Sequence, residues 1–281
     1  MTNALARFFV SLGSPILGAA RARRLVARTY AIGYLVFFYL SAQYARAALG
    51  MLWIVLSPVL FLAVYLPVMT YVFKASLPGS SGPWDYALFI VAGFLPWSAF
   101  SDGFGQGAAS LANNAAIVRH SPTPPGTLPL VKVSVAFAGL LAGLFAFVVL
   151  LTLLGRFPGV RLVLLPVSVG LLYIFSLGLA WLFSSLAVYV RDILQLIPSL
   201  LLVEFFACPV VYSPRSDMGP ITPFIQWNPL TPFLALFRAA LAPTAEFAWV
   251  DLFLASVWAG GAFMLGTLVF RRLQDGLADA V

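Results

Sequence analysis

The sequence has 281 residues, of which 62% are hydrophobic and 9% are charged, with a mean hydropathy of +1.00 and a formal net charge of +7. A soluble domain carries about 25% charged residues, and a water-soluble fold of this length cannot bury so much apolar surface. The composition therefore excludes a soluble globular protein and predicts an integral membrane protein. It also disfavours a nucleic-acid partner, because no basic stripe with interleaved aromatics lies outside the apolar segments.

The residue types that build metal and redox sites are scarce. Cys208 is the single cysteine, so the chain cannot form an internal disulfide, and its apolar surroundings predict a small packing residue. His120 is the single histidine, whereas zinc and haem sites need several nitrogen or sulfur ligands. We therefore expect no metal or cofactor to be bound by this chain.

The N-terminal region does not resemble a cleaved signal sequence. The apolar stretch 8–20 is followed, not preceded, by the arginines of 21–28, which is the wrong order for a signal peptide. The uncharged stretch 29–45 is long enough to be a span. We instead expect a helix over 29–47 that lies in the cytoplasmic membrane interface, with its tyrosines at headgroup depth.

Six segments are apolar for about twenty residues, which is the length that a spanning helix needs. They are 51–73, 86–111, 130–154, 162–188, 193–212 and 249–270. Their hydrophobicity is continuous, not alternating, and they are too long for barrel strands. The sequence predicts an all-α integral membrane fold in which residues 1–281 form a single transmembrane domain.

The basic residues predict the orientation of this domain. With six spans, one side of the membrane holds eleven lysines and arginines, including the cluster at 21–28, and the other side holds five. The positive-inside rule then places both termini in the cytoplasm. A seventh span at 29–45 would place the N-terminal arginine cluster outside.

Three connecting segments have recognisable patterns. The cytoplasmic loop 112–129 predicts a short helix followed by an extended prolyl stretch. Arg191 and Asp192 form the tight cytoplasmic turn between the fourth and fifth spans, and a solvated turn explains them equally well. The outer segment 213–248 is apolar and rich in proline, so we expect two re-entrant half-helices there, not a solvated loop.

The second half-helix of the outer segment has candidate end signals. Asn228 is expected to cap its start, with Pro229 at the first helical position. Arg238 is expected near its end, where a cation satisfies the last carbonyls. The alternative is that the segment is a packing element with no moving role.

Two acids lie well inside predicted spans. Charge in hydrocarbon is costly, so Asp102 and Glu204 are candidates for lining a polar path, with hydrogen-bonded packing as the alternative. Trp97 and Phe100 are candidates for the same path, because aromatic rings suit the C–H faces of sugars. Interface belts and bundle packing explain such aromatics equally well.

The sequence contains no motif for catalysis. It has no Walker motif, Gly-rich phosphate loop or nucleophile elbow, and one histidine cannot support a nucleophile–base arrangement. We expect the chain not to be an enzyme and to take its energy from a partner.

The order of short motifs along 45–241 resembles the permease subunits of bacterial type-2 ABC exporters for O-antigen, capsule and teichoic-acid polymers. The segments that carry this resemblance are "YARAALGMLWIVLSPVL" (44–60), "GFLPWSAF" (93–100), "NNAAIVRHSPTPPGTLPLVKV" (113–133), "YVRDI" (189–193), "CPVVY" (208–212) and "NPLTPFLALFRAAL" (228–241). The chain departs from the family at Cys208, where Ser is common, and at Phe237, where Tyr is common. Its coupling loop keeps few basic residues, namely Arg119 and His120.

The resemblance implies a homodimer in the bacterial inner membrane that encloses a conduit, with two separate ABC ATPase subunits that bind ATP and Mg. It implies that a lipid-linked polysaccharide is exported. The ATPase interface would then include Arg46, Asn113, Arg119, His120, Arg191 and Asp192. The outer gate would include Phe224, Trp227, Asn228, Pro229 and Arg238.

Other functions stay open at the level of sequence. An exporter of the same fold for a drug or small lipid is the nearest alternative. A membrane-embedded lipid transferase would need charged or histidine-rich clusters at the membrane surface, which this sequence lacks. A structural anchor for a larger assembly is the third alternative.

Overall fold

The computed structural model describes residues 33–41, 49–53, 56, 60, 63–64, 67–68, 83–120, 124–212, 219, 222–242 and 245–277. The chain divides into two units, 1–50 and 51–281. In the first unit, residues 33–41 are helical, and the Ser41 hydroxyl donates a hydrogen bond to the Phe37 carbonyl. This stretch falls within the helix expected at 29–47, whose ends lie outside the described residues. Most of the span expected at 51–73 lies outside them too.

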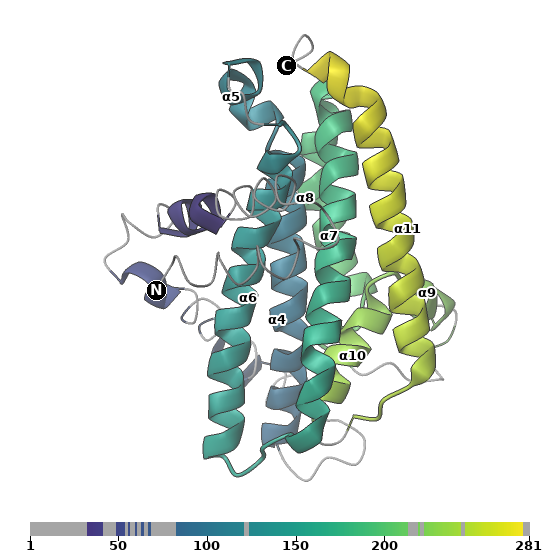
Figure 1. Cartoon of the computed structure of the whole chain (residues 1–281). Helices are drawn as coiled ribbons and strands as arrows, with labels where there is room; N and C mark the ends of the chain where they lie inside the picture. Colours follow the sequence, from purple (N-terminus) through teal and green to yellow (C-terminus); the bar gives the residue numbers. More distant parts are fainter. Residues whose placement is uncertain are drawn as a thin grey trace, which may run out of the picture. The chain divides into compact units, whose positions relative to one another are not determined.

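The described residues form helices and no strands, in agreement with the all-α prediction. Figure 1 shows their arrangement. Their bounds are η1 (Gly50–Leu52), α4 (Pro83–Ala108), η3 (Ala112–Asn114), α5 (Ala115–His120), α6 (Thr127–Leu153), η4 (Gly159–Val163), α7 (Leu164–Tyr189), α8 (Asp192–Ala207), α9 (Thr222–Trp227), α10 (Thr231–Leu241), α11 (Trp249–Leu273) and η6 (Gln274–Gly276).

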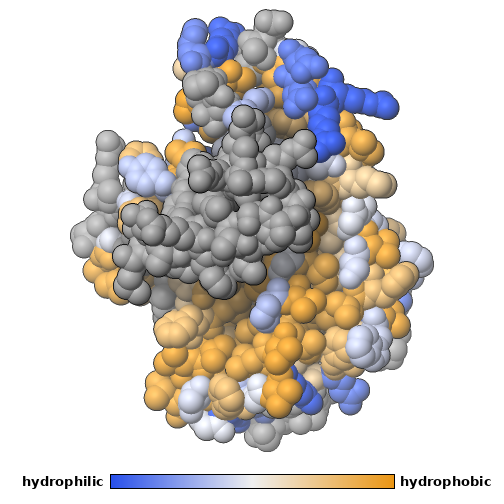
Figure 2. All heavy atoms as spheres, viewed as in Figure 1, coloured by the Kyte–Doolittle hydropathy of each residue, from blue (hydrophilic) through white to orange (hydrophobic). Residues whose placement is uncertain are grey.

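Four helical stretches of the described chain are long and apolar enough to cross a membrane. They are Asp85–Ala108, Thr127–Leu153, Gly159–Tyr189 and Trp249–Gly276. They coincide with the spans predicted at 86–111, 130–154, 162–188 and 249–270, and α7 packs against α4, α6 and α11. Figure 2 shows apolar residues covering much of the visible side of this bundle. The chain is therefore a multi-pass membrane protein.

The fifth predicted span, 193–212, is shorter than expected. Helix α8 has 16 residues and ends at Ala207, so it is about 24 Å long, whereas the hydrocarbon core is about 30 Å thick. The helix ends because Cys208 precedes Pro209 and adopts an extended conformation, with φ −95° and ψ 149°. A residue before proline is driven out of the helical region by steric clash.

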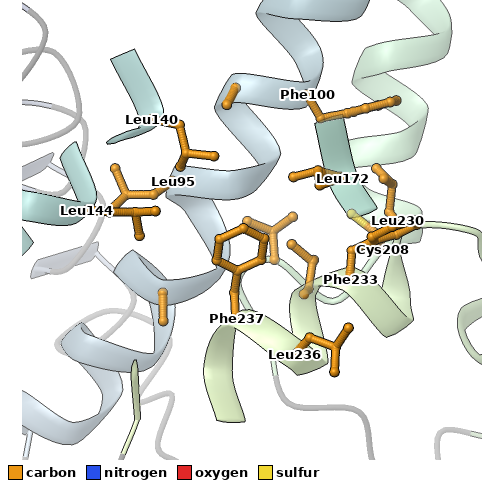
Figure 3. Close-up of a cluster of buried hydrophobic side chains, with 14 of the residues drawn as sticks. Leu95, Phe100, Leu140, Leu144, Leu172, Cys208, Leu230, Phe233, Leu236 and Phe237 are labelled. Atoms are coloured by element: carbon orange, nitrogen blue, oxygen red, sulfur yellow. The ribbon is translucent and has the colours of Figure 1, made fainter. Parts of the chain in front are cut away.

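The apolar core of the bundle forms around α4 (Figure 3). Leu95 of α4 lies against Leu140 and Leu144 of α6, while Phe233 and Phe237 of α10 enter from the other side. Further along α4, Phe100 stacks on Phe104 and Phe175, each with ring centroids 5.7 Å apart. Helix α10 is thus seated inside the bundle, which fixes the outer segment against α4.

Helices α7 and α11 make the closest helix–helix contact of the described chain. A Cβ atom built on Gly266 of α11 would lie 2.0 Å from the Gly178 carbonyl oxygen of α7. A Cβ on Gly178 would lie 2.5 Å from the Ala262 backbone. In lipid, small residues stabilise such crossings because they let two backbones approach and gain dispersion contacts.

Candidate functional site

The loop between α4 and α6 lies at the same end of the bundle as the α7–α8 turn and the end of α11 (Figure 1). The structure has the expected short helix in this loop, as η3 followed by α5. Most of the expected prolyl stretch lies outside the described residues. Its described end is a turn, which a hydrogen bond of 2.9 Å from the Thr127 amide to the Pro124 carbonyl closes.

A small apolar cluster lies beneath this loop. Its buried members, which we call the loop-end cluster, are Leu111, Val188, Phe270 and Leu277. Val118 of α5 packs against the cluster, as do Leu128 and Trp181. The Trp181 indole N–H also donates a hydrogen bond of 2.9 Å to the Gly126 carbonyl. The loop is therefore fastened to the ends of α7 and α11 by side-chain packing.

The residues expected to contact an ATPase are exposed at this end. Asn113, Arg119 and His120 project from η3 and α5, Arg191 occupies the turn before α8, and Asp192 is the first residue of that helix. No ion pair joins Arg191 to Asp192 within the described part of the chain. Arg46, the remaining candidate, lies outside the described residues. The structure thus brings two of the predicted segments to one exposed end.

The exposed charge at this end is mainly positive. Arg271 and Arg272 in the last turn of α11 add to the cations of the loop and the turn, and Asp275 of η6 is a nearby acid. Figure 2 shows the hydrophilic residues gathered there. Such a surface suits an acidic protein partner or anionic lipid headgroups.

The four residues proposed to line a path do not form one group. Asp102 is exposed on α4, whereas Phe100 is buried among the aromatic rings of the core, so we reassign it as a core residue. Trp97 packs between Phe94 and Phe205, with centroid distances of 6.1 and 4.6 Å. The sequence alone could not predict which of these residues is buried, because burial depends on neighbours from other helices.

Glu204 precedes Phe205 on α8, and Phe205 is the residue that packs against Trp97. The Glu204 side chain lies close to Asn228 of the outer segment. One carboxylate oxygen of Glu204 and the indole nitrogen of Trp97 are buried without a partner among the described residues. These two groups therefore have hydrogen-bonding capacity that contacts outside the described residues could use.

Arg238 of α10 is buried and contacts the non-helical segment that follows α8, not the end of its own helix. Its Nη2 group donates hydrogen bonds to the carbonyls of Pro209 and, over 2.8 Å, of Val210. Its guanidinium carbon lies 3.7 Å from the centre of the Phe89 ring, a cation–π contact. The expectation that Arg238 satisfies the last carbonyls of its own helix is therefore wrong. Because α8 ends at Ala207, the carbonyls of Pro209 and Val210 lie outside the helix, and both accept from the Nη2 atom of Arg238.

Two further residues of α4 complete the Arg238 contact, and sequence analysis missed both. A Cβ on Gly93 would lie 2.6 Å from the Arg238 Nη2 atom, so only glycine leaves room for the guanidinium. The Tyr86 hydroxyl donates a hydrogen bond of 3.0 Å to the Val211 carbonyl. Gly93, the glycine in "GFLPWSAF", could have indicated a position where another group packs closely on α4. The sequence does not show that this group is Arg238.

The start of α10 also differs from the expectation. The helix begins at Thr231 after Leu230, with no side-chain cap and with Pro232 in its first turn. The Asn228 side-chain oxygen instead accepts a hydrogen bond of 2.8 Å from the Leu230 amide. Asn228 and Pro229 therefore form a turn before the helix, because asparagine closes such turns through its own side chain.

The first piece of the outer segment is the short helix α9. Its Phe224 and Trp227 side chains are each 77% exposed, so they are available for contacts outside the chain or for lipid. Residues 213–218, 220–221 and 243–244 of the outer segment lie outside the described residues. The two short helices agree with the predicted interruption of this segment by proline.

The chain is similar to several permease and transport proteins. It is 29% identical over 252 residues to the O-antigen export system permease protein RfbA of Myxococcus xanthus, covering 86% of this chain and 92% of that protein. It is 28% identical over 203 residues to the protein of the same name from Klebsiella pneumoniae, covering 71% and 75%. It is 20% identical over 239 residues to the polysialic acid transport protein KpsM of Escherichia coli, covering 85% and 91%. No family model matches the chain. These similarities confirm the resemblance that the motifs predict.

Proposed function

We propose that this chain is the membrane-spanning subunit of an ATP-driven ABC exporter in the bacterial inner membrane, and that it exports a lipid-linked polysaccharide of the O-antigen or capsule type. The observation that carries the proposal is the similarity to named O-antigen export permeases, which extends over most of the chain. A bundle with four helices suited to spanning supports it. A drug or small-lipid exporter has no such support among the named relatives.

ATP hydrolysis is assigned to a separate partner that binds ATP and Mg, present in two copies. The partner is proposed to dock on η3–α5 and on the turn at Arg191 and Asp192. The loop-end cluster supports docking of the ATPase on η3–α5. Because the loop packs against α7 and α11, a movement of the docked partner would be transmitted to these helices. The basic balance of the same end also supports its cytoplasmic location, with both termini on that side.

A homodimer provides the conduit in this proposal. Asp102 is exposed on a helix suited to spanning, and a charge facing lipid at that depth costs about 2.5–3.5 kcal/mol. A second copy or a watery path beside α4 removes this cost. The Trp97 indole nitrogen and one Glu204 carboxylate oxygen, which have no partner among the described residues, are proposed to face the same path.

The outer segment is proposed to gate the conduit. Arg238 holds α10 to the end of α8, and α9 presents Phe224 and Trp227 outward. In a dimer, two copies of α9 would meet over the conduit and close it in the resting state. The two half-helices would lie in the outer leaflet, with their irregular backbone packed on protein.

The function is tested by reconstitution. The chain is purified with its proposed partner ATPase and placed in proteoliposomes. We expect lipid-linked polysaccharide to stimulate ATP hydrolysis and to appear on the far side of the membrane. Stimulation by small amphiphiles but not by polysaccharide would favour the drug or small-lipid alternative, and no interaction with the ATPase would reject both.

Arg119 provides the site-specific test. Arg119→Glu is expected to weaken binding of the ATPase by at least about tenfold, or about 1.4 kcal/mol, because an exposed cation at an interface becomes an anion. Arg119→Lys keeps the charge and serves as the matched control. Both are measured by titration of the ATPase onto immobilised permease. Equal affinity of the two variants would remove Arg119 from the interface.

A further inference from the structure

The last described turn of the chain closes onto the loop between α4 and α6. Leu277, which follows η6, is fully buried in the loop-end cluster beside Leu111, Val188 and Phe270. Residues 271–275 just before it are largely exposed. The Leu277 side chain is therefore buried in the protein, immediately after the exposed and charged stretch 271–275.

Close contacts hold this turn in place. The Tyr189 hydroxyl at the end of α7 donates a hydrogen bond of 3.3 Å to the Leu273 carbonyl. A Cβ on Gly276 would lie 2.8 Å from that same hydroxyl oxygen, so glycine allows the approach. The loop and α11 also meet directly, since a Cβ on Gly126 would lie 3.2 Å from the Phe270 ring.

Helix α5 depends on these neighbours for its position. It has six residues, none of them buried, and an isolated helix of that length is unstable in water. Val118 is its residue in contact with the loop-end cluster. The orientation of α5 is therefore set from below, by the apolar surface to which Leu277 contributes.

We infer that Leu277 is a positioning residue that holds α5 in the orientation required by the ATPase, so that the C-terminal turn belongs to the coupling apparatus. This inference rests on the proposed function. Leu277 touches neither nucleotide nor polysaccharide and acts through the loop-end cluster, against which Val118 packs. Removal of its side chain leaves a void in that cluster, and water enters because the site lies at the exposed end of the bundle.

The first experiment measures the contact without any partner. Cys208 is replaced by alanine, Val118→Cys is introduced into the full chain, and the rate of alkylation is measured in detergent. Leu277→Ala is expected to accelerate alkylation about tenfold, which is about 1.4 kcal/mol of local opening. The matched control is Leu268→Ala on the neighbouring helix α11, because Leu268 is 53% exposed. Equal rates in the two variants overturn the inference.

Two further variants separate local loosening from misfolding. Leu277→Met conserves apolar volume, so Val118→Cys is expected to be alkylated at the same rate as in the parent chain, which keeps Leu277. A chain that ends at residue 277 is expected to label like the parent, whereas one that ends at residue 276 labels like Leu277→Ala. Fast labelling of the chain that ends at 277 would assign the effect to residues 278–281 and overturn the role of Leu277.

The second experiment measures coupling with the ATPase. Leu277→Ala is expected to lower polysaccharide-stimulated hydrolysis about tenfold while basal hydrolysis stays within about twofold, and Leu277→Met restores stimulation. Normal stimulation in a Leu277→Ala chain with fast labelling overturns the positioning role. Lack of stimulation in the parent chain rejects the proposed function, whereas the labelling rates still decide whether Leu277 holds α5.

Discussion

The contact between α7 and α11 makes a sharp prediction about Gly266. An added Cβ would lie 2.0 Å from the Gly178 carbonyl oxygen, whereas ordinary contacts begin at 3.4 Å. The helices must therefore separate by about 1.4 Å, and a gap of 0.5–1 Å already loses a quarter to a half of each dispersion contact. We expect Gly266→Ala to destabilise the chain by about 3 kcal/mol, at the upper end of overpacking effects.

Helix α11 offers matched controls for this experiment. Gly260 and Gly261 are exposed, and nothing lies within 4 Å of a Cβ built on either. Alanine at these positions is expected to be neutral or stabilising by up to about 1 kcal/mol, because alanine favours helix. Thermal unfolding in one detergent gives the comparison. If Gly266→Ala unfolds at the same temperature as Gly261→Ala, the helices do not cross where the structure places them.

Three other predictions concern charged residues. Arg238→Met is expected to lower stability by at least about 2 kcal/mol, because two buried carbonyls lose their donor, while thermal unfolding of Arg238→Lys should show a smaller loss. Asp102→Leu is expected to reduce polysaccharide export and Asp102→Asn to preserve it, and equal export by the two would assign Asp102 to packing. In whole cells of a Cys208→Ala strain, an impermeant thiol reagent is expected to label Glu246→Cys and not Asp275→Cys, and the reverse pattern would invert the proposed orientation.

The sequence predicts the long helices well because their signal is local. A continuous apolar run of about twenty residues is best explained by a membrane-spanning helix. The helices at 130–154 and 249–270 could therefore be predicted without knowing what packs against them. The fifth span illustrates where this reasoning ends. Hydropathy continues through Cys208, but the backbone stops being helical there because of Pro209. Hydropathy indicates which residues lie in an apolar environment, but it does not indicate where the helix ends.

The position of the exposed loop could be predicted from the sequence, but the side-chain contacts of Arg238 and Leu277 could not. The exposed loop with Arg119 follows from the spacing of the spans, since any segment between two of them must emerge at the surface. The partners of Arg238 could not be predicted, because Val210 and Phe89 are distant in sequence and meet it only in the packed bundle. The burial of Leu277 has the same origin. Phe270 is close to it in sequence, but Leu111 and Val188 are separated from it by long stretches of chain and meet it only in the folded bundle.

The Arg238 contact also constrains the order in which the protein assembles in the membrane. Helix α10 is synthesised after α8, and its guanidinium has no ion-pair partner among the described residues. Its insertion is costly until the carbonyls of Pro209 and Val210 are already presented beside α4. Docking of α10 is therefore a late step that waits for the preceding helices. A chain arrested before that step would hold a charged arginine without hydrogen-bond acceptors in the membrane, which is a costly state.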